Sequence, residues 1–246
     1  MAMAWYTIPG KEGDSPAAEW CHFPGKRYIM TRRDRDDVLR LYLGYSGDDA
    51  KLKTALRHGT MAERKEAWAN IFRHDMHECW QVPRFLDGMD SPEAADFYTE
   101  DLAQIKLDTW SNGRVVLLGD AAFCPAPLTG MGTSLAMAAS YVLAGEIANV
   151  CGKAYEEGSN SWDNLPDALK AYETSLRPFV DHVQSTPVKW MAKRLMPESY
   201  LTIRLFHCIA WLIEVLRLDK LGAAFASDDR GLWKLPQYPV LEGKKK

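Results

Sequence analysis

The first 48 residues alternate short apolar runs with turn residues, a pattern typical of an antiparallel β-sheet. The charged segment Arg32–Asp37 separates two of these runs and predicts a solvated hairpin turn. Four runs are strand candidates, and three or four of them could form a meander that makes up most of an antiparallel sheet: Trp5–Ile8, Trp20–Phe23, Arg27–Thr31 and Val38–Tyr45.

Residues 49–90 change to helical spacing. Asp48 or Asp49 can cap a first helix that ends near His58, and Thr60 with Glu63 forms a capping box for a second helix reaching about Arg73. A third helix is expected from about Asp75 towards Leu86, disturbed by Pro83 because proline lacks an amide donor.

The middle of the chain predicts two strands and a helix. Residues 96–108 read as one strand. Val115–Leu118 is an apolar run without polar alternation, as expected for a strand covered on both faces. The alanine-rich run Thr133–Ile147 predicts a closely packed helix.

The C-terminal third predicts further helices. Asp163 is expected to cap a helix with Pro166 in its first turn, and Arg177–Pro178 to bend that helix without ending it. Val188–Leu195 predicts a short basic helix. Tyr200–Leu218 has the length of a membrane span, but its four ionisable side chains would be costly there, so we expect a packed helix.

Composition narrows the function classes. The net charge is −3 and basic residues are dispersed, which argues against a nucleic-acid partner. The five cysteines are scattered, and no signal-peptide pattern opens the chain, so we expect a cytoplasmic protein with free thiols. His74, His77, Glu78 and Cys79 are metal-ligand types without a ligand frame such as HExxH or CxxC, so no metal site is predicted.

The most informative stretch follows the Val115–Leu118 run. Gly119–Asp120 turns the chain and leaves a carboxylate at the end of the predicted strand, where open α/β sheets bind ligands. Gly130 and Gly132 then precede the alanine-rich helix. A helix N-terminus lined by glycine offers unpaired N–H groups to an electron-rich ligand.

The sequence GRVVLLGDAA, followed by P-x-x-G-x-G and an alanine-rich helix, resembles the second flavin-binding motif of FAD-dependent aromatic hydroxylases. This p-hydroxybenzoate hydroxylase-like family includes tetracycline-modifying and fungal polyketide-tailoring monooxygenases. Flanking segments extend the resemblance: Gln104-Ile105-Lys106 and Trp110 upstream, Tyr172-Glu173 and Leu176-Arg177-Pro178 downstream.

The resemblance implies FAD as cofactor, NADPH or NADH as reductant, and hydroxylation of an aromatic or polyketide-like small molecule in secondary metabolism. Asp120 would bind the ribitol hydroxyls, Pro127 would lie near the isoalloxazine, and the amides of Gly130, Met131 and Gly132 would face its N1–C2=O edge. Many members have histidine where this chain has Phe123-Cys124, which we interpret as altered packing.

No catalytic side chain is identified. Gln104 is as well explained as a sheet amide as by a substrate contact. For His22 and Arg27, surface or sheet packing is the preferred interpretation over a place in a substrate pocket.

The family's G-x-G-x-x-G unit for the pyrophosphate is absent from the sequence. The resemblance therefore covers about the C-terminal half of a family enzyme, so we expect a fragment or a shortened protein. A non-catalytic remnant that binds a small molecule or partner without flavin is one alternative, and a related flavoprotein oxidoreductase is another. An uncovered Val115–Leu118 strand predicts self-association, or pairing with a missing N-terminal half.

The predicted fold is mixed α/β. Residues 1–110 form a substrate-domain-like sheet with helices, 111–160 the flavin-motif strand, loop and helix, and 161–246 the C-terminal helices.

Overall fold

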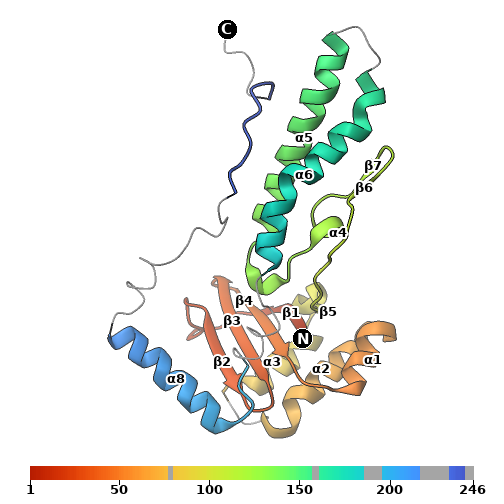
Figure 1. The fold of residues 1–246 in the computed structure, drawn as a ribbon. Helices are drawn as coiled ribbons and strands as arrows, with labels where there is room; N and C mark the ends of the chain where they lie inside the picture. The colour runs from red at the N-terminus through yellow and green to blue at the C-terminus, as the bar shows by residue number, and fades with distance from the viewer. Residues whose placement is uncertain (77–79, 157–160, 186–195, 217–232, 242–246) are drawn as a thin grey trace. The chain divides into compact units, whose positions relative to one another are not determined.

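In a computed structural model, the chain forms two compact units. The first comprises Met1–Leu102 with Lys189–Leu221, and the second Ala103–Val188 with Gly222–Lys246. The structure describes residues 1–76, 80–156, 161–185, 196–216 and 233–241. Figure 1 labels the helices and strands, and each unit is described by itself below.

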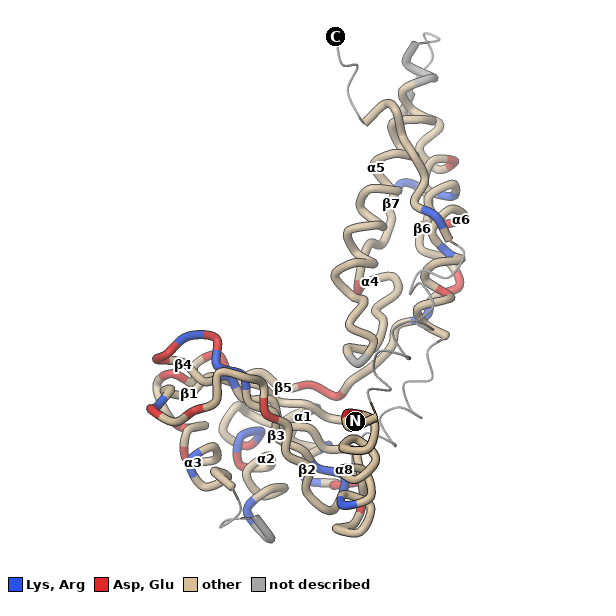
Figure 2. Tube along the Cα trace, turned by 90° about the vertical axis from the view of Figure 1, so that its left-hand side faces the viewer, with Lys and Arg blue, Asp and Glu red and all other residues tan. Residues whose placement is uncertain are grey.

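The first unit contains a five-stranded antiparallel sheet with the order β2-β3-β4-β1-β5. The predicted antiparallel sheet is thereby confirmed, but only β2, β3 and β4 follow one another as a meander, because β1 pairs with β4 and not with β2. The charged β3–β4 turn stands out in Figure 2. The strands are β1 (Ala2–Pro9), β2 (Glu19–Phe23), β3 (Arg27–Arg35), β4 (Val38–Tyr45) and β5 (Tyr98–Asp101).

Helices cover one face of this sheet. Alternate residues of β1, among them Ala4, Tyr6 and Ile8, are buried in a core that includes Trp68 and Phe85. The Tyr6 hydroxyl donates to the Phe85 carbonyl oxygen at 2.7 Å, which satisfies the one polar atom of that buried ring. The covering helices are α1 (Ala50–His58), α2 (Met61–Met76) and α3 (Val82–Asp87), followed by η1 (Gly88–Asp90) and η2 (Pro92–Asp96).

The predicted caps of α1 and α2 are present. The Asp49 carboxylate accepts from the Leu52 amide at 2.7 Å, and Thr60 and Glu63 exchange the two bonds of a capping box. The third helix was expected to begin near Asp75, which was wrong: α3 begins at Val82, with Pro83 in its first turn, where a missing amide costs nothing.

The other face of the sheet carries a row of large side chains that crosses all five strands. The strand register pairs Trp20 with Met30, Met30 with Tyr42, Tyr42 with Trp5, and Trp5 with Tyr98. Directly paired residues of antiparallel strands point to the same face, so these five form one line. The Trp5 and Tyr98 rings lie 4.6 Å apart.

A further helix, α8 (Tyr200–Val215), belongs to the first unit. The helix expected over Tyr200–Leu218 is thus present, but the prediction that it is packed was wrong, because Ile203 is its one buried residue. Ser199 and Thr202 form a capping box at its start. Its contact with the sheet is made to β2, where the Phe206 ring packs edge-on against His22 at 5.1 Å.

The second unit is built on two long helices, α5 (Gly132–Glu156) and α6 (Leu165–Gln184), which pack against each other. The helix predicted over Thr133–Ile147 is confirmed, and α6 continues through Pro178 as expected. The predicted Asp163 cap was wrong: the N-cap is Asn164, with no side-chain bond. The smaller elements are β6 (Ser111–Asn112), β7 (Val115–Val116), α4 (Asp120–Phe123), η3 (Pro127–Thr129) and η4 (Ser161–Asn164).

Two strand predictions in the middle of the chain were wrong. The strand expected over 96–108 ends at Asp101, where its pairing with Ala2 of β1 ends. The strand expected to be covered over Val115–Leu118 is a two-residue strand paired only with β6, and the Val115 side chain is 67 % exposed. No other described strand supplies the second partner that a covered strand needs.

One stretch of α5, Gly132–Gly152, is long and apolar enough to cross a membrane by length and composition alone. Leu135, Ala139 and Val142 of this stretch lie in the core shared with α6, as in the core helix of a folded unit. The predicted basic helix over 188–195 lies outside the described residues.

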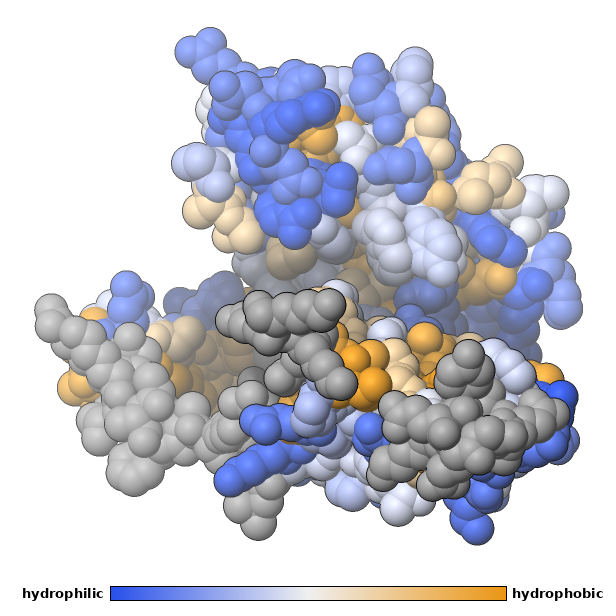
Figure 3. All heavy atoms as spheres, turned by 90° about the horizontal axis from the view of Figure 1, so that it is seen from above, coloured by the Kyte–Doolittle hydropathy of each residue, from blue (hydrophilic) through white to orange (hydrophobic). Residues whose placement is uncertain are grey.

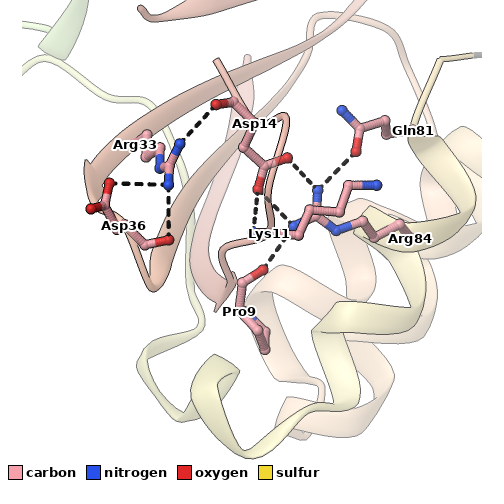
Figure 4. A network of polar contacts seen from close by, with 7 residues as sticks. All are labelled: Pro9, Lys11, Asp14, Arg33, Asp36, Gln81 and Arg84. Carbon is pink, nitrogen blue, oxygen red and sulfur yellow. Dashed lines mark hydrogen bonds and ion pairs between the residues drawn. The ribbon is translucent and has the colours of Figure 1, made fainter. Parts of the chain in front are cut away.

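A buried ion pair joins the loop after β1 to α3 (Figure 4). The Asp14 carboxylate accepts from Arg84 at 2.6 and 2.9 Å, and its side chain is 1 % exposed. Arg84 also donates to the Pro9 carbonyl oxygen and to Gln81. The hydrogen bond from Arg84 holds the pKa of Asp14 below its ordinary value of 3.8.

We expect Arg84→Met to destabilise the first unit by about 3 kcal/mol at pH 7, because it leaves a buried carboxylate unpaired. A depressed pKa stabilises the fold above pH 3.8, and this contribution is lost as the pH falls through the folded-state value. The difference between wild type and variant should therefore shrink below pH 4 in urea unfolding measured across pH.

The matched control is Arg35→Met, which removes an exposed ion pair with Asp37 and should cost less than about 1 kcal/mol. Equal losses in the two variants would contradict a special role for the Asp14–Arg84 pair.

Candidate functional site

The N-terminus of α5 presents backbone donors without partners. The Gly130 amide donates to Pro127 at 3.0 Å, and the Met131 amide to the Thr129 hydroxyl at 3.2 Å. Within the described chain, the amides of Gly132 and of the two residues after it donate no hydrogen bond. They are the first-turn groups that a helix leaves unsatisfied, and the helix dipole adds positive potential there.

Gly119 places the predicted carboxylate beside this helix end. Its φ of +62° and ψ of −136° are open to glycine but strained for other residues. A Cβ built on Gly119 would lie 3.6 Å from the Cβ of Ala136, in the second turn of α5. Asp120, the next residue, begins α4 and is exposed. Its carboxylate makes no hydrogen bond or ion pair with another described residue.

The space in front of these groups is open. A Cβ on Gly130, whose φ is +64°, would meet nothing within 4 Å, and one on Gly132 would meet only Pro125, at 3.9 Å. Unpaired amides, an unpaired carboxylate and room for close approach suit the electron-rich ring edge and the hydroxyl-bearing chain of a flavin. Pro127 is exposed and Met131 half-buried in the same loop.

Phe123-Cys124, the departure from the family pattern, has a packing role. The Phe123 ring is 1 % exposed and lies 4.7 Å from the Trp110 ring. Phe123 thus fills the core beneath the candidate site, while Asp120 remains free at the surface.

The segment before the motif is irregular and is held by one buried side chain. Gln184, the last residue of α6, donates to the carbonyl oxygens of Ile105 at 2.7 Å and Phe123 at 3.0 Å. The Ile105 amide in turn donates to Cys124 at 3.1 Å. Gln184 therefore joins the upstream segment to the residues that follow Asp120. Sequence reasoning missed it, although a polar residue one position after Val183 on an apolar helix face was an available signal.

A second tie involves two parts of the family resemblance that lie far apart in sequence. The Glu173 carboxylate accepts from the Trp110 amide at 2.9 Å and forms an ion pair with Arg177. The Arg177 guanidinium lies over the Trp110 ring at 4.3 Å and donates to the Asp108 carbonyl oxygen. The flanking residues of the motif thus contact each other and support its position.

The remaining candidate side chains have packing roles. The Gln104 amide group donates to the Gln184 carbonyl oxygen at 3.4 Å, which favours its interpretation as a structural amide. Arg27 lies on the helix-covered face, where it donates to Pro24 and Ile71 carbonyl oxygens. His22 lies on the opposite face and contacts Phe206.

No group of three or more potential metal ligands is found among the described residues whose side chains are placed. The sequence cluster that ends at Cys79 lies largely outside them, because residues 77–79 and the side chain of His74 are not among the described parts of the chain.

Comparison with known proteins gives concordant matches. A family model described as an FAD binding domain matches residues 44–182. The FAD-dependent monooxygenase asL4 of Sarocladium schorii is 36 % identical over 97 % of this chain and 56 % of its own length. The flavin-dependent monooxygenase eupH of a Phoma species is 36 % identical over 96 % of this chain and 54 % of its own.

Solved structures show the same fold. The tetracycline destructase Tet(55) matches with a TM-score of 0.69 and 21 % identity, over 96 % of this chain and 55 % of its own. Tet(51) gives 0.67 and 18 %, over 96 % and 54 %. The chain thus spans about half the length of the curated relatives it matches.

We expect Gln184→Leu to destabilise the second unit by about 1–3 kcal/mol, because the buried carbonyl oxygen of Phe123 and the partly buried one of Ile105 lose their donor. Hydrogen exchange should locate the effect, with faster exchange of the Ile105 amide. Gln104→Leu is the matched control, since it removes only one long bond, and it should leave that amide protected. Unchanged exchange in Gln184→Leu would show that the segment is held by other contacts.

Proposed function

The chain belongs to the FAD-binding-domain family of flavin-dependent monooxygenases, and on that premise we propose that it is the part of such an enzyme that holds the flavin ring and the substrate. One observation carries the proposal: Asp120, a carboxylate without a partner among the described residues, follows Gly119 at a glycine-lined helix end whose amides are unpaired.

In this proposal, Asp120 accepts hydrogen bonds from the ribitol hydroxyls. The loop from Gly130 through Met131 to Gly132 gives its amides to the N1–C2=O edge of the ring, and Pro127 lies against the ring. Gly130 already donates within the loop, so the strongest donors are the amides from Gly132 onward. Positive potential at this helix end favours negative charge on the ring. When bound, FAD supplies oxygen activation, with NADPH or NADH as the source of electrons.

The first unit supports the substrate class that we propose. The row of large side chains across its sheet ends in two aromatic residues, Trp20 and Tyr98, whose side chains are 44 % and 48 % exposed. Flat rings on a sheet face offer stacking area to another flat ring. This supports an aromatic or polyketide-like small molecule, and a place in secondary metabolism. The base that would accept the substrate proton is not among the residues identified.

A second candidate is a flavin-free module that binds a small molecule or a partner. It is favoured by the absence of G-x-G-x-x-G, the unit that holds the pyrophosphate in dinucleotide-binding folds. A related flavoprotein oxidase or reductase would share the motif but would not consume NADPH in response to an aromatic substrate.

We also propose a cytoplasmic location. Four cysteines in the described residues are free thiols, which fits a reducing compartment.

The first test is an absorbance spectrum of the purified chain, with and without added FAD, after desalting. A retained flavin band is expected, and Asp120→Asn should weaken FAD binding roughly 10- to 100-fold by removing charged hydrogen-bond acceptors. Asp108→Asn, an exposed carboxylate in the same unit, is the matched control and should bind like wild type.

Absence of a band in the wild-type chain, or equal loss in both variants, would favour the flavin-free module. If flavin is retained, NADPH oxidation stimulated by a polycyclic phenol separates a monooxygenase from a related oxidoreductase.

A further inference from the structure

Within the described part of the chain, most of the apolar surface of helix α8 is uncovered. Ile203 is its only buried residue, whereas the large hydrophobic side chains from Tyr200 to Leu216 are otherwise mostly exposed. In the view of Figure 3, hydrophobic residues lie at the surface in several separate places among hydrophilic ones. The exposed apolar side chains of α8 are neighbours on one helix, and a contiguous apolar patch on a folded unit indicates a binding surface.

The exposed residues form a stripe on the side of α8 that faces away from β2. A helix turns about 100° per residue, so residues spaced by three and four share a side. The leucine stripe, as we name it, contains no charged residue, and its five large side chains are between 47 % and 77 % exposed. Its members are Leu201, Leu205, Cys208, Ile209, Leu212 and Leu216.

The stripe is symmetric about its midpoint. If a second α8 is laid against it in the antiparallel direction, Leu201 lies opposite Leu216, Leu205 opposite Leu212, and Cys208 opposite Ile209. A two-fold axis between two copies requires this self-complementarity, because each surface must match itself. A partner of a different sequence requires no such symmetry.

The residues beside the stripe are compatible with a second copy. Arg204 and Trp211 lie on the same flank, where two antiparallel helices bring each Arg204 near the Trp211 of the other copy. A guanidinium over an indole ring is attractive. The other charged residue of α8, Glu214, lies on the far side from the stripe, so no like charges meet across the axis.

The stripe is large enough for an interface near the lower size limit, and the start of α8 is fixed. Full burial of the exposed stripe would remove roughly 500 Å² per copy, so a pair reaches the approximately 1,000 Å² that a specific interface should clear. The start of α8 is anchored to the β2–β3 turn, where the Gly25 amide donates to Glu198 at 2.9 Å and the Lys26 amide to Pro197 at 3.2 Å. A membrane surface is less suitable, because membrane-surface helices carry a polar face rich in lysine and arginine, and α8 has only Arg204.

We propose that two copies of this chain associate through an antiparallel pair of α8 helices, joined along the leucine stripe. The occupant of the stripe is a second copy of the same surface, and Cys208 lies next to the two-fold axis.

Sedimentation of the whole chain over a range of concentrations tests this proposal. We expect a dimer of twice 27.8 kDa. Leu205→Arg with Leu212→Arg should weaken association at least 100-fold, because four apolar side chains per dimer are replaced by charges. Both positions are exposed, so circular dichroism should show an unchanged fold.

The matched control is Leu117→Arg with Leu118→Arg, which places the same charges on the other exposed apolar run. This variant should still dimerise. Loss of the dimer in this control but not in the α8 variant would move self-association to the Val115–Leu118 strand and overturn the proposal.

Cysteine cross-linking tests the direction of the helices. In a Cys208→Ser background, a mixture of Leu201→Cys and Leu216→Cys chains should form disulfide-linked dimers on mild oxidation, and Leu201→Cys alone should not. Cross-linking of Leu201→Cys alone would indicate parallel helices and contradict the proposed geometry.

A chain that stays monomeric at all concentrations would overturn the proposal. Flotation with phosphatidylcholine–phosphatidylserine vesicles then shows whether the stripe binds a lipid surface.

Discussion

Residues 103–110 have no neighbouring strand among the described elements to hold them in place, and of these residues only Trp110 is buried. Side chains of α6 hold the segment instead. Gln184 donates to Ile105, Arg177 donates to Asp108, and Glu173 accepts from Trp110. These bonds fix a largely exposed segment against the core that supports Asp120. The position of the candidate site therefore depends on a helix 60 to 80 residues away in sequence.

Features that depend on neighbours in sequence could be predicted. The Asp49 cap and the Thr60–Glu63 capping box involve residues three positions apart, and both are present. Short apolar runs bounded by turn residues predicted β1 to β4. The end of the strand expected over 96–108 could not be predicted, since it is set by the pairing of Asp101 with Ala2, a residue far away in the sequence.

The residues of the candidate site also fall into two groups, those that the sequence could predict and those that it could not. Glycine at 119 and 130 could be interpreted from sequence, because left-handed backbone conformations select for it, and both residues have positive φ. The roles of Gln184 and Arg177 could not, because a glutamine or an arginine on a helix has many possible partners. Only the folded structure selects the carbonyl oxygens they reach. The apolar run Val115–Leu118 was predicted to be covered because its residues suit a core, but composition does not state which chain supplies the cover.

The two exposed apolar surfaces differ in what can cover them. A strand edge presents unpaired N–H and C=O groups as well as side chains, so only another strand satisfies it fully. Covering Val115–Leu118 would therefore take a β-pairing partner. All interior backbone groups of α8 are bonded within the helix, so its leucine stripe needs only apolar packing, which another helix provides. The two surfaces thus differ in the partner they require, a strand in one case and a helix in the other, and each surface can be occupied without the other.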